Sequence, residues 1–189
     1  MSAELPQRGP SPLRFRDFRL MWGGFFVSQV GTQMQVVAVA WQVYQLTGDP
    51  LALGAIGLAR VLPVIVLGVF GGVFADVVDR RRLLLGTQTA MMLCSLGLWW
   101  LTDTGRVSMP LLYAFCVLAG SATALSNPAR QALIPTLVPE ATLPRALGLS
   151  VSSWQLATVL GPTLGGFVLA AHGPAAVYLL DAASFVAMI

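Results

Sequence analysis

Two charged residues stand inside long apolar stretches of the chain, Arg60 in the second stretch and Asp181 in the sixth. A charge inside lipid is costly, so such a residue usually pairs with an opposite charge or faces a water-filled cavity. We expect both residues in the outer half of the membrane, and we hypothesise that they form a buried pair that is structural or proton-linked. The alternatives are that Arg60 snorkels to the outer interface and that Asp181 only orders the start of its helix.

Amide and hydroxyl side chains recur at helical spacing in the first and fourth apolar stretches. In lipid such groups turn toward other helices or toward a cavity, and we favour cavity lining over hydrogen bonds between helices. Arg130 shares a face with two of them near the inner mouth, unless it is an ordinary anchor at the membrane surface. The predicted cavity residues are Gln29, Thr32, Gln33, Thr123, Asn127 and Arg130.

The composition excludes several other classes of protein. The chain of 189 residues is 56% hydrophobic and 10% charged, whereas soluble domains carry about 25% charged residues. All basic residues are arginines, and apart from Arg60 they lie in the N-terminal tail or near the ends of apolar stretches rather than on one helical face, which argues against nucleic-acid binding. The sequence has a single histidine and no metal-ligand cluster, phosphate loop or catalytic triad, so it predicts no enzyme, no metal and no cofactor.

Six apolar stretches that could form membrane-spanning helices position these residues, which predicts an all-α, polytopic membrane protein. The first is too long and polar for a signal peptide, although Ala38-Val39-Ala40 has the form of a cleavage site. Arginines gather on one side, which predicts a cytoplasmic N-terminus. The predicted segments are a cytoplasmic tail, 1–19, and spans at 20–46, 51–75, 83–101, 109–129, 145–171 and 175–189.

The turn between the second and third stretches is short and ends in three arginines. Asp76 closes one helix and Arg80 opens the next, so both charges oppose the local helix dipoles and we expect partners elsewhere. The alternative is a plain turn between two spans. Two glycines close the second stretch and two lie near the end of the fifth, on opposite sides of the membrane, as two inverted three-helix repeats would place them.

The fifth stretch combines glycines with a proline. Glycines four residues apart allow a neighbouring helix to pack closely, and a proline among them favours a bend. The residues of this glycine–proline motif are Gly148, Gly161, Pro162, Gly165 and Gly166.

Two motifs resemble signatures of the major facilitator superfamily. The turn resembles the loop between its second and third helices at Gly72, Asp76, Arg80 and Arg81, with departures at Val77 and Asp79. The fifth stretch resembles its antiporter signature, with Ala157 in place of a glycine. Segments at 60–63, 127–135 and 181–185 are similar to the enterobactin-exporter-like, transmembrane secretion effector branch. The arginine of drug–proton antiporters would align near Cys116 and is absent.

The resemblance implies the N-terminal six-helix half of a twelve-helix secondary transporter in the inner (plasma) membrane of a bacterium. Such a transporter works by alternating access and would export a small siderophore-like or drug-like amphiphile. Its expected partners are the lipid bilayer, the small-molecule substrate and a C-terminal half that lies outside this chain. The resemblance also implies that the turn motif latches the two halves and that the glycines of the fifth helix pack between them. The alternative is a truncated half that does not transport and acts only as a fragment or assembly partner.

Overall fold

The computed structural model describes residues 10–77 and 79–188, without the side chains of residues 69–77. Every regular element in these ranges is helical, which confirms the all-α prediction. The short 3-10 turns are η1 (Pro12–Arg14) and η2 (Glu140–Thr142), and the helices are α1 (Arg16–Thr47), α2 (Pro50–Val77), α3 (Arg80–Asp103), α4 (Met109–Leu137) and α5 (Leu143–Val186).

Tight turns at one end of the bundle reverse the chain. Gly48 ends α1 with a φ of 62°, a left-handed conformation that glycine adopts without strain, and its N–H donates to the carbonyl of Tyr44. The Asp49 carboxylate then accepts the Leu51 N–H at 2.9 Å, which fixes the start of α2. Two residues therefore suffice to connect α1 and α2.

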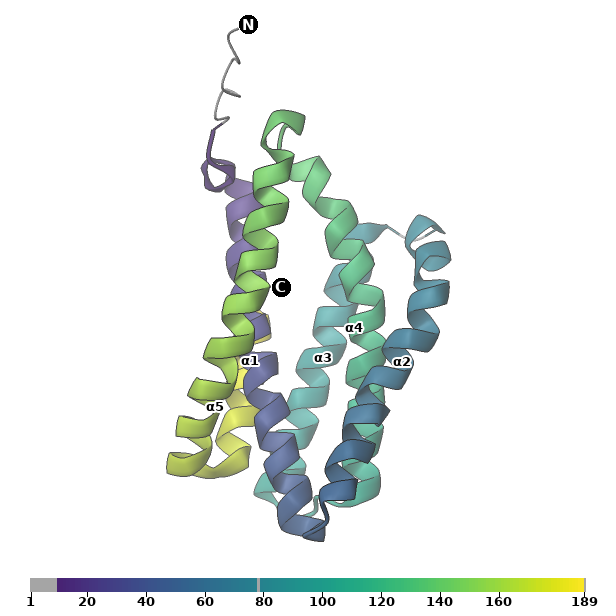
Figure 1. The fold of residues 1–189 in the computed structure, drawn as a ribbon, viewed down its shortest axis with the longest axis vertical. Helices are drawn as coiled ribbons and strands as arrows, with labels where there is room; N and C mark the ends of the chain where they lie inside the picture. The colour runs from purple at the N-terminus through teal and green to yellow at the C-terminus, as the bar shows by residue number, and fades with distance from the viewer. Residues whose placement is uncertain (1–9, 78, 189) are drawn as a thin grey trace, which may run out of the picture.

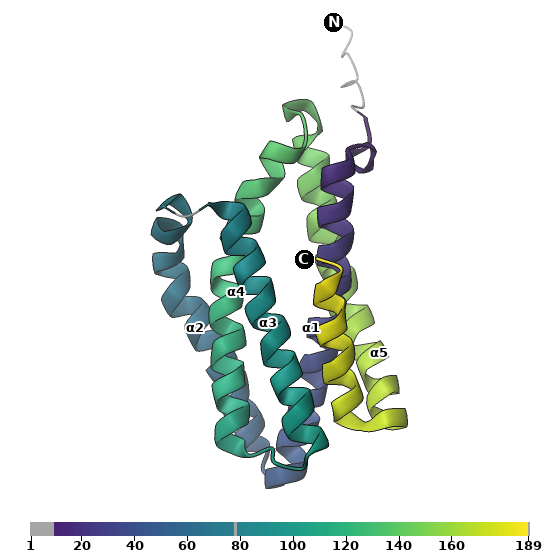
Figure 2. The ribbon, with the colours of Figure 1, turned by 180° about the vertical axis from the view of Figure 1, so that it is seen from behind.

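Helix α5 consists of two arms that meet at Gly173. This residue has a φ of 76° and a ψ of 179°, and Pro174, which has no N–H to donate, begins the second arm. Figure 2 shows that the chain reverses there and that the second arm runs back along the bundle. The fifth and sixth apolar stretches of the sequence are these two arms.

Four helical segments in the described residues are long and apolar enough to cross a membrane. Helix α1 has 32 residues but is not among them, and its glutamines lower its hydropathy. The four candidate spans are Pro50–Gly68, Arg80–Asp103, Met109–Leu137 and Glu140–Val186, the last of which contains both arms of α5.

The helices pack as two pairs, and α3 joins the pairs (Figure 1). Helix α1 lies against α5, α2 lies against α4, and α3 contacts both α4 and α5. The largest buried apolar cluster includes Met34, Val43, Leu112 and Tyr178. The interior therefore joins residues from all parts of the chain.

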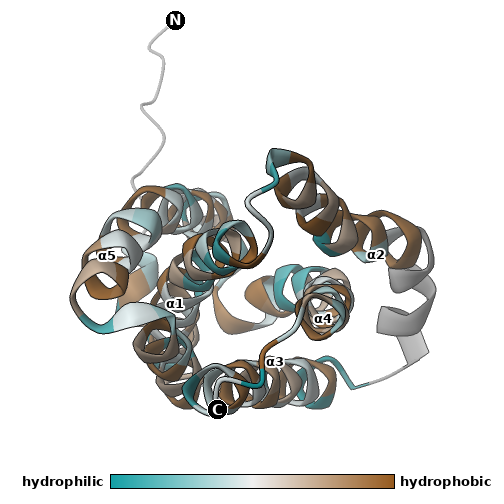
Figure 3. Ribbon diagram, turned by 90° about the horizontal axis from the view of Figure 1, so that it is seen from below, coloured by the Kyte–Doolittle hydropathy of each residue, from teal (hydrophilic) through white to brown (hydrophobic). Residues whose placement is uncertain are grey.

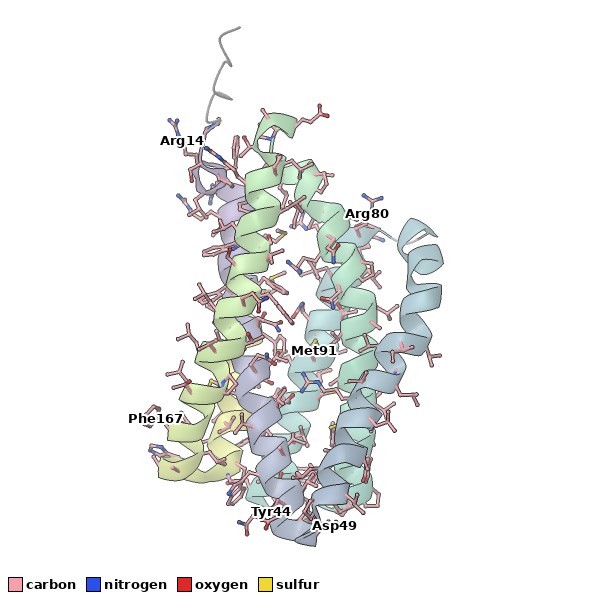
Figure 4. All side chains as sticks on the ribbon, viewed as in Figure 1. Arg14, Tyr44, Asp49, Arg80, Met91 and Phe167 are labelled. Carbon is pink, nitrogen blue, oxygen red and sulfur yellow. The ribbon has the colours of Figure 1, made fainter. Side chains whose placement is uncertain are left out.

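The outside of the bundle is apolar, as lipid contact requires. Leu51 and Phe167 are 81% and 72% exposed, and Figure 3 shows hydrophobic residues along all the labelled helices. Arg14 and Arg80 lie at one end of the bundle and Tyr44 and Asp49 at the other, with Phe167 pointing away from it (Figure 4). The bundle thus has an apolar belt with arginines at one end.

Candidate functional site

Asp181 is fully buried and its carboxylate is bound by a residue of another helix. The hydroxyl oxygen Oγ of Ser95, in α3, lies 2.6 Å from Asp181 Oδ2. The amide nitrogen Nε2 of Gln35, in α1, donates to the same Ser95 Oγ at 3.0 Å. The other oxygen, Oδ1, has no hydrogen-bond partner among the described residues and lies against α1, where a Cβ built on Gly31 would come within 2.8 Å of it. Through Oδ2, Asp181 of α5 is therefore linked to Ser95 of α3 and, by way of Ser95, to Gln35 of α1.

The Ser95 hydroxyl can serve Asp181 in either protonation state. It has one hydrogen, and both Asp181 Oδ2 and the Met91 carbonyl, at 3.1 Å, are within reach. With an ionised Asp181 the hydroxyl donates to the carboxylate. With a protonated Asp181 the carboxyl donates to Ser95, which then donates to Met91.

Among the described residues no direct salt bridge joins Asp181 to Arg60, although the two charges interact at longer range. Within the described part of the chain no charged nitrogen of Arg60 contacts the Asp181 carboxylate, whose bonded partner is Ser95. Asp181 also does not cap its helix, because that hydrogen bond reaches α3. Arg60 is half-buried, and Gly120 of α4 packs against its backbone carbonyl.

Four of the predicted cavity residues meet around a small internal cavity of about 60 Å³. All five helices contribute to its wall, which also includes Arg60 and Gln88. In the part of the chain that the structure describes, nothing bonds to the buried Gln88 Oε1, and such a group next to a polar cavity is a site for water. The four residues are Gln29, Thr32, Thr123 and Asn127.

The remaining two predicted residues lie elsewhere. Gln33 packs against Gly161 of α5, so its backbone and Cβ are part of a helix contact. Arg130 lines a second cavity of about 330 Å³ between α4 and the first arm of α5, and Asn127 contributes to the walls of both cavities. The polar face of α4 thus connects the two cavities.

Comparisons with known proteins identify the type of protein to which these cavities belong. The sequence profile of the transmembrane secretion effector family matches residues 8–189, almost the whole chain. The chain belongs to this family, within the major facilitator superfamily. No solved structure matches the chain.

Several bacterial members of the superfamily are similar to the chain in sequence. The Staphyloferrin A transporter of Staphylococcus aureus is 25% identical over 169 residues, which cover 89% of this chain and 41% of the relative. The Enterobactin exporter of Salmonella choleraesuis is 29% identical over 170 residues, 88% of this chain and 40% of the relative. An uncharacterized MFS-type transporter of Bacillus subtilis is 26% identical over 160 residues, which cover 84% of this chain and 37% of the relative. The chain therefore spans about two-fifths of the length of these relatives.

Membership of the family makes the chain a multi-pass membrane protein of a transporter family rather than an enzyme. In the turn motif, the surroundings of Gly72 and the side chain of Asp76 lie outside what the structure describes. Arg80 Nη1 donates to the Ala132 carbonyl of α4 at 3.2 Å, and Arg81 is exposed. Arg80 thus ties the turn to α4.

Asp79, one of the two positions at which the turn departs from the signature it resembles, caps α3. Its Oδ1 accepts the backbone N–H groups of Arg81 at 2.9 Å and Arg82 at 3.2 Å. Both N–H groups stabilise the charged carboxylate and so hold the pKa of Asp79 below its usual value. The N–H of Arg82 has the larger effect and that of Arg81 the smaller. An aspartate directly before the first residue of a predicted helix is a sequence signal for an N-cap, and Asp79 before Arg80 fits that signal.

The glycine–proline motif of α5 divides between two environments. Gly161 and Gly165 are buried against α1, where an added Cβ would clash with Gln33 and with Met34 respectively. Their close packing is therefore made within this chain rather than against another half. Gly148 and Gly166 have open space beside them, and Pro162 is exposed.

Proposed function

We propose that the chain is the N-terminal six-helix half of a secondary active transporter that exports small amphiphilic molecules by alternating access. The observation that carries this proposal is the polar cavity lined by Gln29, Thr32, Arg60, Thr123 and Asn127 inside a bundle whose outside is apolar. Polar groups are retained in a membrane interior where they face a substrate path or other helices. The family of the chain makes the substrate path the favoured reading.

The six spans of this proposal are α1 to α4 and the two arms of α5. The reversal at Gly173 supports two separate spans, and α1 is long enough to cross a core of roughly 30 Å at about 1.5 Å per residue. Arginines at 14, 80–82 and 145 then face the cytoplasm with the N-terminus, by the excess of positive charge on that side. The membrane would be the inner membrane of a bacterium.

A C-terminal half is the proposed partner. The relatives are more than twice as long as the matched segment, which leaves room for a second six-helix unit in them. Gly72, Asp76, Arg80 and Arg81 would latch the two halves while the cavity is open to the outside. Gly148, Pro162 and Gly166 of α5, which have open space or exposure here, would pack at the same boundary.

The names of similar proteins guide the choice of substrates to test. One relative is named for staphyloferrin A, one for enterobactin and one for macrolides. We therefore propose a siderophore-like or drug-like amphiphile as the cargo.

The experiment is export by bacterial cells that express the gene through its own stop codon. We expect retained enterobactin, staphyloferrin A or erythromycin to fall relative to cells with an empty vector, and Thr123→Val with Asn127→Leu to abolish this difference at equal membrane abundance. Asp76→Asn should reduce export while membrane insertion is retained. Retention equal to the empty vector for every compound tested would support the alternative, a half that does not transport.

A further inference from the structure

Arg130 is a buried cation that has no acidic partner among the described residues. Its side chain is 9% exposed, and its Cζ lies 3.9 Å from the centroid of the Phe25 ring of α1. Its Nε has no hydrogen-bond partner, and among the described residues no carboxylate or carbonyl accepts from the guanidinium. One face of the charge is therefore covered by an aromatic ring, while the buried Nε–H has no acceptor among the described residues.

This arrangement is unfavourable unless something else binds the guanidinium. Burial of a charge costs far more than burial of a neutral group, and a ring face recovers only part of that cost. The planar guanidinium presents donors in a fork that fits a carboxylate or a phosphate with two parallel hydrogen bonds. An anionic group is the chemistry that would complete the site.

The space beside Arg130 is large enough for a small ligand. The cavity measures about 330 Å³, which lies in the range of about 300–1,000 Å³ for small-molecule sites. One part of its wall is polar, with Asn127 and Ser150, and the other is apolar, with Val151 and Trp154. The wall therefore suits a molecule with a charged end and an apolar or aromatic body.

We propose that the cavity between α4 and the first arm of α5 binds the anionic group of an amphiphile, with Arg130 as its ligand. Asn127 and Ser150 offer neutral hydrogen bonds, and Trp154 contacts the apolar body. The inference deepens the proposed function, on which it rests, by naming the charge of the cargo. The anion is the carboxylate of a small molecule or the phosphate of a lipid headgroup, since both present the same oxygen geometry to the fork.

The test compares two probes of equal shape, 2-naphthoate and 2-naphthamide, by calorimetric titration of the complete gene product in an uncharged detergent without added lipid. We expect 2-naphthoate to bind at least about tenfold more tightly, because only its charge engages the guanidinium. Arg130→Gln should remove this preference, and Arg130→Lys should retain part of it as a point charge without the fork. Arg82→Gln, at an exposed arginine, is the matched control and should leave the preference unchanged.

Two further arms identify the source of the anion. The same titration in nanodiscs of phosphatidylglycerol and of phosphatidylcholine shows whether the lipid phosphate competes; weaker 2-naphthoate binding only in phosphatidylglycerol supports the site and assigns a lipid occupant. Equal binding of both probes to the wild type, or an unchanged preference in a folded Arg130→Gln or Arg130→Lys protein, overturns the proposal. Equal binding is also the result if an acid elsewhere in the complete protein pairs with Arg130.

This binding assay is independent of transport. Arg130-dependent binding without export would support the proposed anion site but refute the proposed function. Export without any Arg130-dependent preference would refute the site alone.

Discussion

Asp181 and Arg130 are both buried charged residues, but their surroundings differ. Asp181 lies at the centre of a packed contact between α1, α3 and the second arm of α5, and Ser95 and Gln35 form a hydrogen-bonded chain to it. Arg130 lies beside a cavity, with an aromatic ring on one face of its guanidinium and an Nε–H that has no acceptor in the described part of the chain. The first charge is integrated into the fold, and the second is available to a ligand.

The difference predicts opposite responses to mutation. Removal of a partner from a packed, hydrogen-bonded group leaves a buried polar atom unsatisfied and destabilises the fold. Removal of an unpaired buried charge leaves nothing unsatisfied and need not destabilise it. The predictions for Gly31, Ser95 and Arg130 use the apparent free energy of unfolding, measured by titration with SDS in mixed micelles.

Substitution of Gly31 by alanine should give the largest effect. An added Cβ would clash with Ser184 Oγ and come within 2.8 Å of Asp181 Oδ1. We expect a loss of about 1–3 kcal/mol, as for other overpacked sites. Gly23→Ala is the control, since nothing lies within 4 Å of that position. Equal stability of the two variants would show that α1 does not pack tightly on Asp181.

Ser95→Ala should have the next largest effect. It removes the bonded partner of Asp181 and leaves Gln35 Nε2 without its acceptor. We expect a loss of about 1–3 kcal/mol. Adding Asp181→Asn to Ser95→Ala should recover part of this loss, because a neutral amide is less costly to bury than a carboxylate. A double variant no more stable than Ser95→Ala would contradict this assignment.

Arg130→Met should change the free energy of unfolding by less than Ser95→Ala, and in the direction of greater stability or no change. Methionine keeps an apolar chain against Phe25 and removes the buried charge. A loss as large as that of Ser95→Ala would show that Arg130 has a partner, and would remove the contrast between the two charges.

The smallest effect should come from the exposed charge of Asp79. Its pKa is lowered in the folded protein by the backbone N–H groups of Arg82 and Arg81. The stabilisation is therefore present above the pKa of an unfolded aspartate and is lost as the pH falls through the lower folded value. We expect Asp79→Asn to flatten the stability profile between about pH 5 and pH 2, measured by thermal unfolding in detergent. An unchanged profile would assign the acid sensitivity to other carboxylates.

Residue types and helical spacing predicted the helices and four of the residues that line the small cavity. The spacing of Thr123 and Asn127 predicted that they share one face, because a helix fixes that relation locally, and both residues line the small cavity. The partners of Asp181 could not be predicted in this way. Ser95 is 86 residues away in sequence and is a single hydroxyl in an apolar stretch, so no periodic pattern marks it. The sequence suggested Arg60 as the partner of Asp181 because these two residues carry opposite charges inside apolar stretches.

The glycines of α5 show a second limit. Their spacing of four predicted close helix packing, which Gly161 and Gly165 make. It did not predict which helix they contact, because the identity of a neighbour depends on how the whole bundle packs. The close approach is to α1 of the same chain.

The most direct test of the account is the accessibility of the α4 polar face from both sides of the membrane. Asn127→Cys, in the complete protein without Cys94 and Cys116, should react with a membrane-impermeant maleimide in both right-side-out and inside-out vesicles, because alternating access exposes the cavity to each side in turn. Phe167→Cys, on the exposed apolar surface, should react in neither. Reaction of Asn127→Cys from one side only, or from neither, would contradict the account.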